Sequence, residues 1–572
     1  MSVPMGPRGR EAALRSLSED EFDVLVVGGG VVGAGVALDA VSRGLSVALV
    51  EARDLAAGTS SRSSKLIHGG LRYLERLDFR LVREALRERG LLVTRLAPHL
   101  VRPVPFLFPL RHRVWERGYV GAGVLLYDTL GGARALPRHR QLSHSRALRE
   151  APGLRGDALV GAIQYYDAQV DDARFTMMVA RTAMQYGACV TTRTKVTGFL
   201  RDGRRVTGAV VRDLESGAEI RVRARQVINA TGVWTDEIQR LAGASPGSRG
   251  SVTVQASKGV HLVVPRERIR LDTGLILRTE KSVLFVIPWG PHWIVGTTDT
   301  PWNLDKVEPA PTRADIDYIL EHVNAVLRTP LTHDDVEGVY AGLRPLLGTP
   351  GSGSSETVKL SREHAVIRPE PGLVIVAGGK YTTYRVMAKD AVDVAVAGLG
   401  RKVPASVTDR VPVLGAAGFE ALRNNRRRLA DRAGLPVARV DHLLGRYGSC
   451  VEEVLALIEG DPRLGEPIPG AEGYLAAEAV YAVTHEGALH LEDVLVRRTR
   501  VFIEERDRGL AAAPEVAALI APVLGWDDDR VRAEIDAYRA EVEADLAAQR
   551  EIDDAAANAV RLAAATPANQ MA

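Results

Sequence analysis

The sequence predicts a multidomain protein of the α/β plus α+β classes, with a parallel-sheet α/β domain, a β-rich second domain and an all-α C-terminal domain. Three observations support this prediction. A strand, a glycine-rich turn and a helix follow one another from residue 23 to 43. Strand-like runs separated by turn residues recur between 206 and 345. After about residue 406 the apolar residues recur at helical spacing, with Pro/Gly breaks.

Length and composition fit a large globular protein. A chain of 572 residues is too long for one compact core, so two or three domains are expected. The content of 46% apolar and 25% charged residues is ordinary, and a net charge of +3 predicts no polyanion-binding role. Cys189 and Cys450 form neither a disulfide framework nor a metal-ligand cluster, which suits a reducing compartment.

The polar segment 1–20 lacks the apolar core of a signal peptide, so we expect a disordered N-terminal tail. No run of apolar residues is long enough to span a bilayer. We therefore predict an intracellular protein that is soluble or peripherally bound to a membrane.

The first unit has the pattern of a dinucleotide site. A buried strand at Asp23–Val27 is followed by Gly28-x-Gly30-x-x-Gly33, a helix, and a second strand ending at Glu51. Gly28 permits a tight turn, Gly30 lets a pyrophosphate approach the backbone, and Gly33 lets helix and strand pack closely. The helix N-terminus favours phosphates, and Glu51 can accept hydrogen bonds from a ribose, which favours FAD or NAD over NADP. A glycine turn without a ligand is the alternative.

A Ser/Gly-rich segment covers residues 58–75 and carries Lys65, His68 and Arg72 among apolar residues. It is either a solvated loop or a loop that packs along a cofactor and presents cations to it; the apolar residues favour the second. An amphipathic helix is expected over 78–96.

Residues 101–130 mix arginines with aromatic and aliphatic residues. This composition is typical of a helix in a membrane interface, and equally of a helix packed on its own domain.

Two later glycine turns accompany the first. A strand closes on Ala230-Thr231-Gly232, and the strand at 372–377 leads into Gly378-Gly379-Lys380 and another helix. Together the three turns resemble the discontinuous nucleotide-binding domain of the D-amino-acid-oxidase-like flavoproteins. Within that superfamily, segments 63–75, 258–261, 294–299 and 378–385 resemble the signatures of FAD-dependent glycerol-3-phosphate dehydrogenases. The resemblance covers residues 21–545 and does not explain the polar N-terminal tail.

The resemblance implies a Rossmann-like FAD-binding domain, a β-rich substrate domain and a helical C-terminal domain. The oxidoreductase domain spans 21–405, and a frayed tail follows the C-terminal domain. The expected parts are 21–100, 150–250 and 350–405 for FAD binding, 101–149 and 250–349 for the substrate, 406–550 for the helical domain and 551–572 for the tail.

The same resemblance implies that sn-glycerol 3-phosphate is oxidised to dihydroxyacetone phosphate, with hydride transfer from C2 to flavin N5 and onward transfer of electrons to a quinone. It further implies a cytoplasmic protein, peripheral on the inner face of the plasma membrane. The implied partners are the substrate, a membrane quinone and, as an option, a second copy of the chain. Neither nucleic acid nor a metal ion is expected.

The implied site needs a phosphate clamp, a base for the C2 hydroxyl, and groups that orient substrate and flavin. Arginine binds phosphate oxygens in pairs, so Arg72 and Arg344 are the expected clamp, with Lys380 as a third cation. His261 is the expected base and His68 the alternative. Tyr73 and Thr382 would orient the substrate. The expected cofactor contacts are Gly28, Gly30, Gly33, Glu51, Thr59, Ser60, Ser64, Leu66, His68, Thr231, Gly232, Gly379, Lys380 and Thr383.

Three other functions compete with this prediction. A glycerol-3-phosphate oxidase would use O2 in place of quinone and release H2O2. An NAD-dependent dehydrogenase would need only the first glycine turn. A non-enzymatic flavin-binding or tRNA-associated module is disfavoured, because the chain lacks a basic nucleic-acid footprint.

Overall fold

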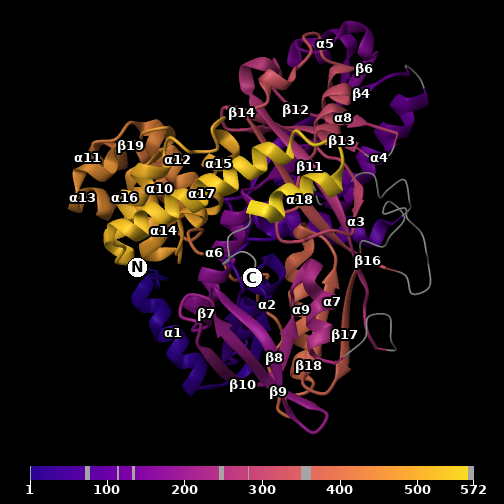
Figure 1. Cartoon of the computed structure of the whole chain (residues 1–572). Helices are drawn as coiled ribbons and strands as arrows, with labels where there is room; N and C mark the ends of the chain where they lie inside the picture. The colour runs from indigo at the N-terminus through magenta and orange to yellow at the C-terminus, as the bar shows by residue number, and fades with distance from the viewer. Residues whose placement is uncertain are drawn as a thin grey trace.

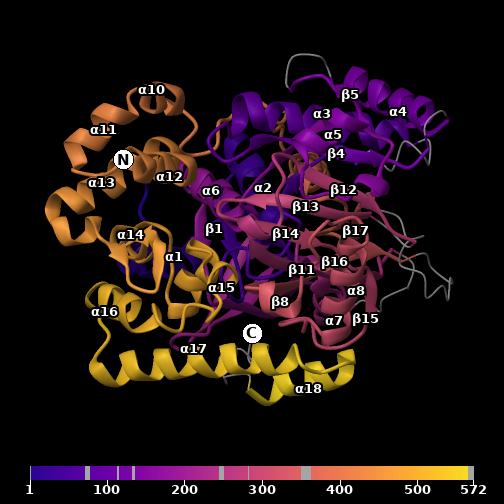
Figure 2. The ribbon, with the colours of Figure 1, turned by 90° about the horizontal axis from the view of Figure 1, so that it is seen from above.

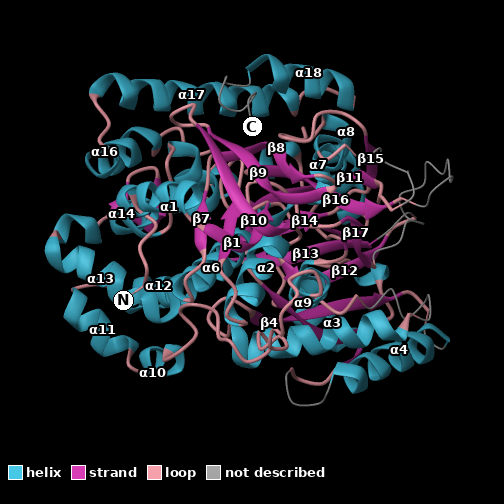
Figure 3. Cartoon of the chain, turned by 90° about the horizontal axis from the view of Figure 1, so that it is seen from below, coloured by secondary structure: helices cyan, strands magenta, loops and turns pink. Residues whose placement is uncertain are grey.

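The computed structural model describes residues 2–70, 78–112, 115–131, 136–243, 250–280, 283–348 and 363–564. Two large sheets form the centre of the molecule, and a helical domain lies to one side of them (Figure 1). Figure 3 shows helices surrounding the strands of both sheets. The expected fold class is confirmed.

The first sheet carries the predicted nucleotide-binding pattern. Its strand order is β17-β18-β10-β1-β2-β7, and the five strands from β18 to β7 are parallel. The sheet consists of β1 (Glu21–Val27), β2 (Val47–Val50), β7 (Cys189–Thr191), β10 (Glu219–Asn229), β18 (Leu373–Gly378) and the antiparallel β17 (His364–Glu370), and it is extended by β8 (Thr194–Asp202) and β9 (Arg205–Asp213). Because β1, β10 and β18 are parallel and adjacent, their carboxyl ends bring the three glycine turns to one edge of the sheet.

Both faces of this sheet are covered. Helices α2 (Val31–Ser42), α6 (Asp172–Gln185) and α9 (Tyr384–Val396) lie together and share a buried apolar cluster with β1 and β2. The short helix α7 (Thr235–Leu241) follows the Thr231-Gly232 turn. Alternate residues of β1, Leu25 and Val27, point into a second cluster with β8, β9 and β10. A strand buried on both faces explains the almost wholly apolar sequence of β1.

The N-terminal segment is ordered, contrary to the expectation of a disordered tail. Helix α1 (Pro7–Glu19) begins with a proline at its first position, where the missing N–H costs nothing. Its Leu17 is fully buried in the cluster beneath β1, and Arg10 pairs with Asp213. Ser2 also donates to Glu453 of the helical domain. Tertiary contacts therefore order a stretch whose composition alone suggested disorder.

The second sheet has the order β15-β11-β14-β13-β12-β4-β6-β3, with β16 beside β11 and β5 beside β6. Helices α5 and α8 share one apolar cluster with it, and α3 and α4 share another. The strands are β3 (Leu66–Ile67), β4 (Arg102–Leu110), β5 (Arg140–Ser143), β6 (Gly161–Gln169), β11 (Val254–Pro265), β12 (Gly274–Arg278), β13 (Val283–Trp289), β14 (His292–Gly296), β15 (Thr300–Trp302) and β16 (Gly338–Leu347). The helices are α3 (Phe79–Leu91), α4 (Trp115–Gly131), α5 (His144–Glu150) and α8 (Arg313–Asn324). Strand β6 pairs with β4, so it belongs to this sheet and not, as expected, to the nucleotide-binding part.

The segment 101–130 is not a single helix. Residues 102–110 form strand β4, in which Phe106 and Phe108 are buried and prolines at 103, 105 and 109 exclude a helix. Only α4 is helical. Its inner face packs Val120, Val124 and Tyr127 on the sheet.

The C-terminal domain is helical apart from a small hairpin of β19 (Pro467–Ile468) and β20 (Ala471–Leu475). Its helices are α10 (Phe419–Asn424), α11 (Arg426–Ala433), α12 (Val437–Tyr447), α13 (Val451–Gly460), α14 (Ala476–His485), α15 (Val501–Glu504), α16 (Ala513–Leu524), α17 (Asp528–Ala548) and α18 (Asp554–Ala564), with a π-helix, η12 (Asp493–Arg498). Figure 2 shows α17 leaving this domain along one side of the molecule. The N–H of Arg313, at the start of α8, donates to the carbonyl oxygen of Glu551, between α17 and α18, at 2.8 Å.

Part of the expected frayed tail is therefore an ordered helix. In α18, Asp554 pairs with Lys258 of β11, and Arg561 pairs with Glu308. These contacts hold the end of the chain against the second sheet. Residues 565–572 lie outside the described part of the chain.

Candidate functional site

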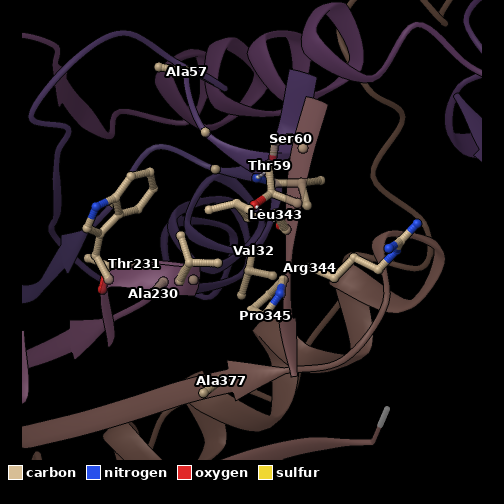
Figure 4. A pocket seen from close by; sticks show the side chains of 18 of the residues that line it. Val32, Ala57, Thr59, Ser60, Ala230, Thr231, Leu343, Arg344, Pro345 and Ala377 are labelled. Atoms are coloured by element: carbon tan, nitrogen blue, oxygen red, sulfur yellow. Dashed lines mark hydrogen bonds between the residues drawn. The ribbon is translucent and has the colours of Figure 1, made fainter. Parts of the chain in front are cut away.

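A cavity of about 480 Å³ lies between the carboxyl edge of the first sheet and strands β11 and β16 of the second. The three glycine turns, segment 57–68 and the two strands all contribute to its lining. Figure 4 shows Thr231 and Arg344 on opposite sides of it, with Val32 and Pro345 between them. A cavity of this size, where a nucleotide-binding edge meets a second sheet, lies within the range of ligand-binding pockets in proteins.

The first turn has the geometry that its glycines predict. Gly28 has a φ of +108°, and a Cβ there would lie 2.9 Å from the carbonyl oxygen of Ala230. A Cβ on Gly33 would collide with the carbonyl oxygen of Gly28, so Gly33 serves packing and does not line the cavity. Gly30 does line it, and a Cβ there would meet only Ser60 Oγ, 3.2 Å away.

Ser60 and Glu51 hold the turn from two sides. The N–H of Val31, at the start of α2, donates to Ser60 Oγ at 3.0 Å. The Glu51 carboxylate accepts from the N–H groups of Gly29, at 2.6 Å, and Arg53, at 2.8 Å. Burial raises the pKa of Glu51 above its usual value, although these hydrogen bonds oppose the shift. The carboxylate is therefore fixed at the cavity wall, where the sequence places a ribose acceptor.

This lining fits FAD. At Gly30 the turn leaves open the space that the side chain of any larger residue would occupy. The Glu51 carboxylate, held in place by its hydrogen bonds, follows at the end of β2. Both features are needed to hold an adenosine diphosphate group at a helix N-terminus.

Segment 57–68 lines the cavity and contacts both strand β16 and the turn that follows β18. Thr59 Oγ1 donates to the carbonyl oxygen of Leu343 at 2.6 Å, and the His68 N–H donates to Thr382 Oγ1 at 3.2 Å. Leu66 and Ser64 also line the cavity. Lys65 departs from expectation: it is fully buried, pairs with Asp172 at 2.8 Å and does not line the cavity. Its charge is thus paired with a carboxylate inside the protein and does not reach the cavity.

His261 lies on β11 and faces the cavity. Its Nε2 lies 2.8 Å from Ser64 Oγ, and its ring stacks on Tyr340 at 4.8 Å between centroids. Within the described part of the chain, Nδ1 has no hydrogen-bond partner. Burial, followed by the charges of Arg344 and Lys65, lowers the pKa of His261 well below its ordinary value. The imidazole is therefore neutral near pH 7 and can accept a proton.

Arg344 lies on β16, which pairs with β11 in antiparallel register. Its Nη2 donates to Thr297 Oγ1 at 2.9 Å and to the Thr298 carbonyl at 3.1 Å, while Nη1 lies 3.4 Å from Asp299. Its guanidinium lies over Gly259, where a Cβ would collide with it. The absence of a side chain at Gly259 therefore lets Arg344 lie over β11 on the cavity side, near His261.

The late turn supplies a further cation and a hydroxyl. Gly378 and Gly379 have φ values of +75° and +81°, which glycine adopts without strain. Lys380 and Thr382 follow them and line the cavity. Thr383 is buried and does not line it; its Oγ1 donates to the Lys380 carbonyl at 3.3 Å. Thr231 and Gly232 close the cavity on the β10 side.

Two expected site residues, Arg72 and Tyr73, lie outside the described part of the chain. Sequence reasoning also missed Arg53 and Arg62, which line the cavity and both bind Glu308 at 2.6 Å. No local pattern marks them, because Glu308 lies more than 240 residues from either. Among the described residues, no group of three or more His, Cys, Asp or Glu side chains is placed to hold a metal ion.

Comparison with known proteins agrees with this geometry. Residues 23–393 match the family model described as FAD dependent oxidoreductase. Residues 406–531 match the model described as C-terminal domain of alpha-glycerophosphate oxidase.

Individual proteins are similar over nearly the whole chain. Glycerol-3-phosphate dehydrogenase 2 of Mycobacterium tuberculosis is 58% identical over 98% of this chain and 95% of that protein. The mitochondrial glycerol-3-phosphate dehydrogenase of Homo sapiens is 38% identical over 93% of this chain and 75% of that protein. The solved structure of the glycerol-3-phosphate dehydrogenase from Bacillus halodurans, complexed with FAD, is 29% identical. It superposes with a TM-score of 0.76 over 94% of this chain and 98% of that one.

Proposed function

The chain belongs to the FAD-dependent glycerol-3-phosphate dehydrogenases, with FAD as its cofactor, and on that premise we propose that it oxidises sn-glycerol 3-phosphate to dihydroxyacetone phosphate and passes the electrons to a membrane quinone. When bound, FAD supplies the hydride acceptor for this chemistry. The observation that carries the proposal is the position of Arg344 and His261 on paired strands facing the same cavity. A phosphate clamp and a proton acceptor close to one another are what this substrate requires.

Arg344 and Lys380 would bind the phosphate, and His261 would accept the proton of the C2 hydroxyl. In the free protein, Arg344 disfavours protonation of His261. The negative charge of a bound phosphate offsets this effect of Arg344. Substrate binding therefore raises the pKa of His261 and makes it a better proton acceptor. Thr382 would orient the substrate, and His68 is the alternative base because it lines the same cavity.

Gly30, Glu51, Thr59, Ser60 and Thr231 would hold the cofactor. The turn at Gly30 would receive the pyrophosphate, and Glu51 would accept hydrogen bonds from the ribose hydroxyls. The remaining contacts would come from Gly28, Ser64, Leu66, Gly232 and Gly379.

We further propose that α4 attaches the protein to the inner face of the plasma membrane, where a quinone is available. The outer face of α4 exposes Trp115 by 60%, Tyr119 by 54%, Leu125 by 56% and Leu126 by 37%. Residues 101–130, the segment that contains α4, hold four arginines and two acidic residues, 4 − 2 = +2. Aromatic and aliphatic side chains combined with excess positive charge are suited to an anionic lipid surface. Within the described part of the chain, no helix is long and apolar enough to cross a bilayer.

A glycerol-3-phosphate oxidase is the second candidate, favoured by the match of residues 406–531 to an oxidase C-terminal domain. One experiment tests both functions. The purified protein is titrated anaerobically with sn-glycerol 3-phosphate while the flavin absorbance is followed. Bleaching supports the substrate, and unchanged flavin bands contradict it. Reoxidation of one portion by air and another by a quinone then distinguishes oxidase from dehydrogenase.

A further inference from the structure

Arg500, from the helical domain, is buried beside the segment that carries Ser64. It follows η12 and is 2% exposed. Its guanidinium donates to Asp171 Oδ1 at 2.6 Å and binds Asp172 Oδ1, while Nη1 lies 3.4 Å from the carbonyl oxygen of Ser61. One side chain of the C-terminal domain thus contacts both the start of α6 and the cavity segment.

Asp172 connects Arg500 to the backbone of segment 61–65. Its Oδ1 accepts from Lys65 Nζ at 2.8 Å, and its Oδ2 accepts from the Ser63 N–H, also at 2.8 Å. Lys65 Nζ donates in addition to the Ser61 carbonyl at 2.7 Å. Lys65 has a φ of +58°, an uncommon conformation for a residue with a side chain. The charge cluster therefore determines the path of this segment, because local preference disfavours it.

The segment in turn holds the His261 ring from two sides. Ser64 Oγ lies 2.8 Å from Nε2. Tyr340, which stacks on the ring, donates its hydroxyl hydrogen to the Ser63 carbonyl at 3.0 Å. A shift of segment 61–65 would displace both neighbours of the imidazole.

The charge cluster beside segment 61–65 consists of five charged side chains. Arg500 and Arg446 come from the helical domain, and Asp171 and Asp172 come from the start of α6. Lys65 is the fifth member. Loss of one cation from a buried cluster leaves a carboxylate partly uncompensated, and its remaining partners must rearrange.

We propose that Arg500 is a positioning residue for the catalytic base: through Asp172 it fixes segment 61–65 and thereby orients His261. This inference rests on the proposed function, in which His261 accepts the substrate proton. It gives the helical domain a part in catalysis, although none of its described residues lines the cavity.

The test compares Arg500→Gln with Arg174→Gln in FAD-loaded protein. Arg174 is a matched control, because it is equally buried and pairs with Glu486 of the helical domain at 2.7 Å, without contacting segment 61–65. The rate of flavin reduction by sn-glycerol 3-phosphate is measured by stopped flow. We expect Arg500→Gln to reduce it at least tenfold with unchanged FAD content and a KM within twofold. Arg174→Gln should lower Tm and leave the rate within twofold.

Three further measurements distinguish a loss of His261 orientation from a general loss of structure. Arg500→Lys retains the charge but has no planar fork to bind both carboxylates, so we expect an intermediate rate. In the His261→Asn background, Arg500→Gln should cause no further loss. The NMR signal of the His261 ring, identified by its absence in His261→Asn, should shift in Arg500→Gln and not in Arg174→Gln, with or without FAD.

The possible results separate a failure of the proposed function from a failure of the positioning proposal. If the wild type is not reduced by the substrate, the proposed function fails. If His261→Asn reacts normally, His261 is not the base, and the proposed role of Arg500 fails with that assignment. If His261→Asn is impaired while Arg500→Gln and Arg500→Lys react within twofold of wild type, the positioning proposal alone is overturned. A further loss in the double variant overturns it as well. If Arg500→Gln does not fold, Arg500→Lys decides the question.

Discussion

The Ser64 hydroxyl oxygen lies 2.8 Å from Nε2 of His261, and this contact joins segment 57–68, which lines the cavity, to the strand that carries the proposed base. Ser64 comes from the segment following the first glycine turn, and His261 from the second sheet. The hydrogen bond thus connects the two halves of the cavity.

Arg344→Ala should raise KM for sn-glycerol 3-phosphate and leave FAD bound. The expected loss in kcat/KM is roughly a hundredfold, about 3 kcal/mol, because a partly buried guanidinium–phosphate contact is removed. Steady-state kinetics and flavin absorbance measure both effects. Arg225→Ala is the control, since the half-exposed Arg225 side chain pairs with Glu21 and Asp23 and does not line the cavity. An unchanged KM would remove Arg344 from the clamp.

His261→Asn should lower kcat roughly 10²- to 10⁴-fold, the usual contribution of a positioned base. In the wild type, burial, Arg344 and Lys65 lower the pKa of His261, so kcat/KM should stay level as the pH falls through the ordinary histidine value of 6.5. Lys65→Met removes one repelling charge. It should therefore move the acid limb of the pH profile to higher pH. If His261→Asn retains normal turnover, the role passes to His68 or to solvent.

Gly30→Val should weaken FAD binding at least tenfold, because its side chain would occupy space beside the cofactor turn. The FAD-free protein should keep its Tm. Gly198→Val is the matched control: nothing lies within 4 Å of a Cβ there, and the residue does not line the cavity. Fluorescence titration with FAD measures the difference. Equal affinity in both variants would place the pyrophosphate elsewhere.

Replacing Trp115 and Leu125 by serine should weaken binding to vesicles that contain anionic lipid, without changing kcat in detergent. Arg111→Gln with Arg117→Gln should add a salt-dependent loss of about 1 kcal/mol, roughly fivefold, per charge near the surface. Ile552→Ser is the control, because Ile552 is 74% exposed and precedes α18, which lies far from α4 in Figure 2. Vesicle sedimentation reports binding. Unaffected binding would show that α4 is not the membrane contact.

His490 should make thermal stability depend on pH. Burial lowers its pKa, but hydrogen bonds to Glu215 and Glu534, each 2.9 Å long, outweigh burial and raise the pKa to about 9. Since the folded pKa lies above the unfolded value, this stabilisation is complete below pH 6.5 and is lost as the pH rises to about 9. Tm should fall over this window, and His490→Asn should reduce the fall. Identical slopes in both proteins would contradict the assignment.

The geometry of the first glycine turn and the nearby carboxylate was predictable because its determinants are local. Gly28, Gly30 and Glu51 lie within one strand–turn–helix–strand unit, whose spacing requires a turn and a nearby carboxylate. The N-terminal tail was wrongly predicted for the opposite reason. Leu17 is one apolar residue in a polar stretch, and only its burial under the first sheet makes α1 stable.

The roles of the cations also depended on long-range contacts. Lys65 has the same sequence context as its neighbours that line the cavity, yet it is buried against Asp172. Arg53 and Arg62 gave no sequence signal, because their shared partner Glu308 lies in another part of the chain.

By itself, the sequence determined the parallel strands, the three glycine turns and the family, since residues close together in the chain specify these features. Tertiary structure decided which charges reach the cavity and which are paired inside the protein. Arg500 and Asp172 are 328 residues apart, and no periodicity connects them. Their pairing exists because packing of the helical domain brings both into a buried site, where an unpaired charge would be strongly unfavourable.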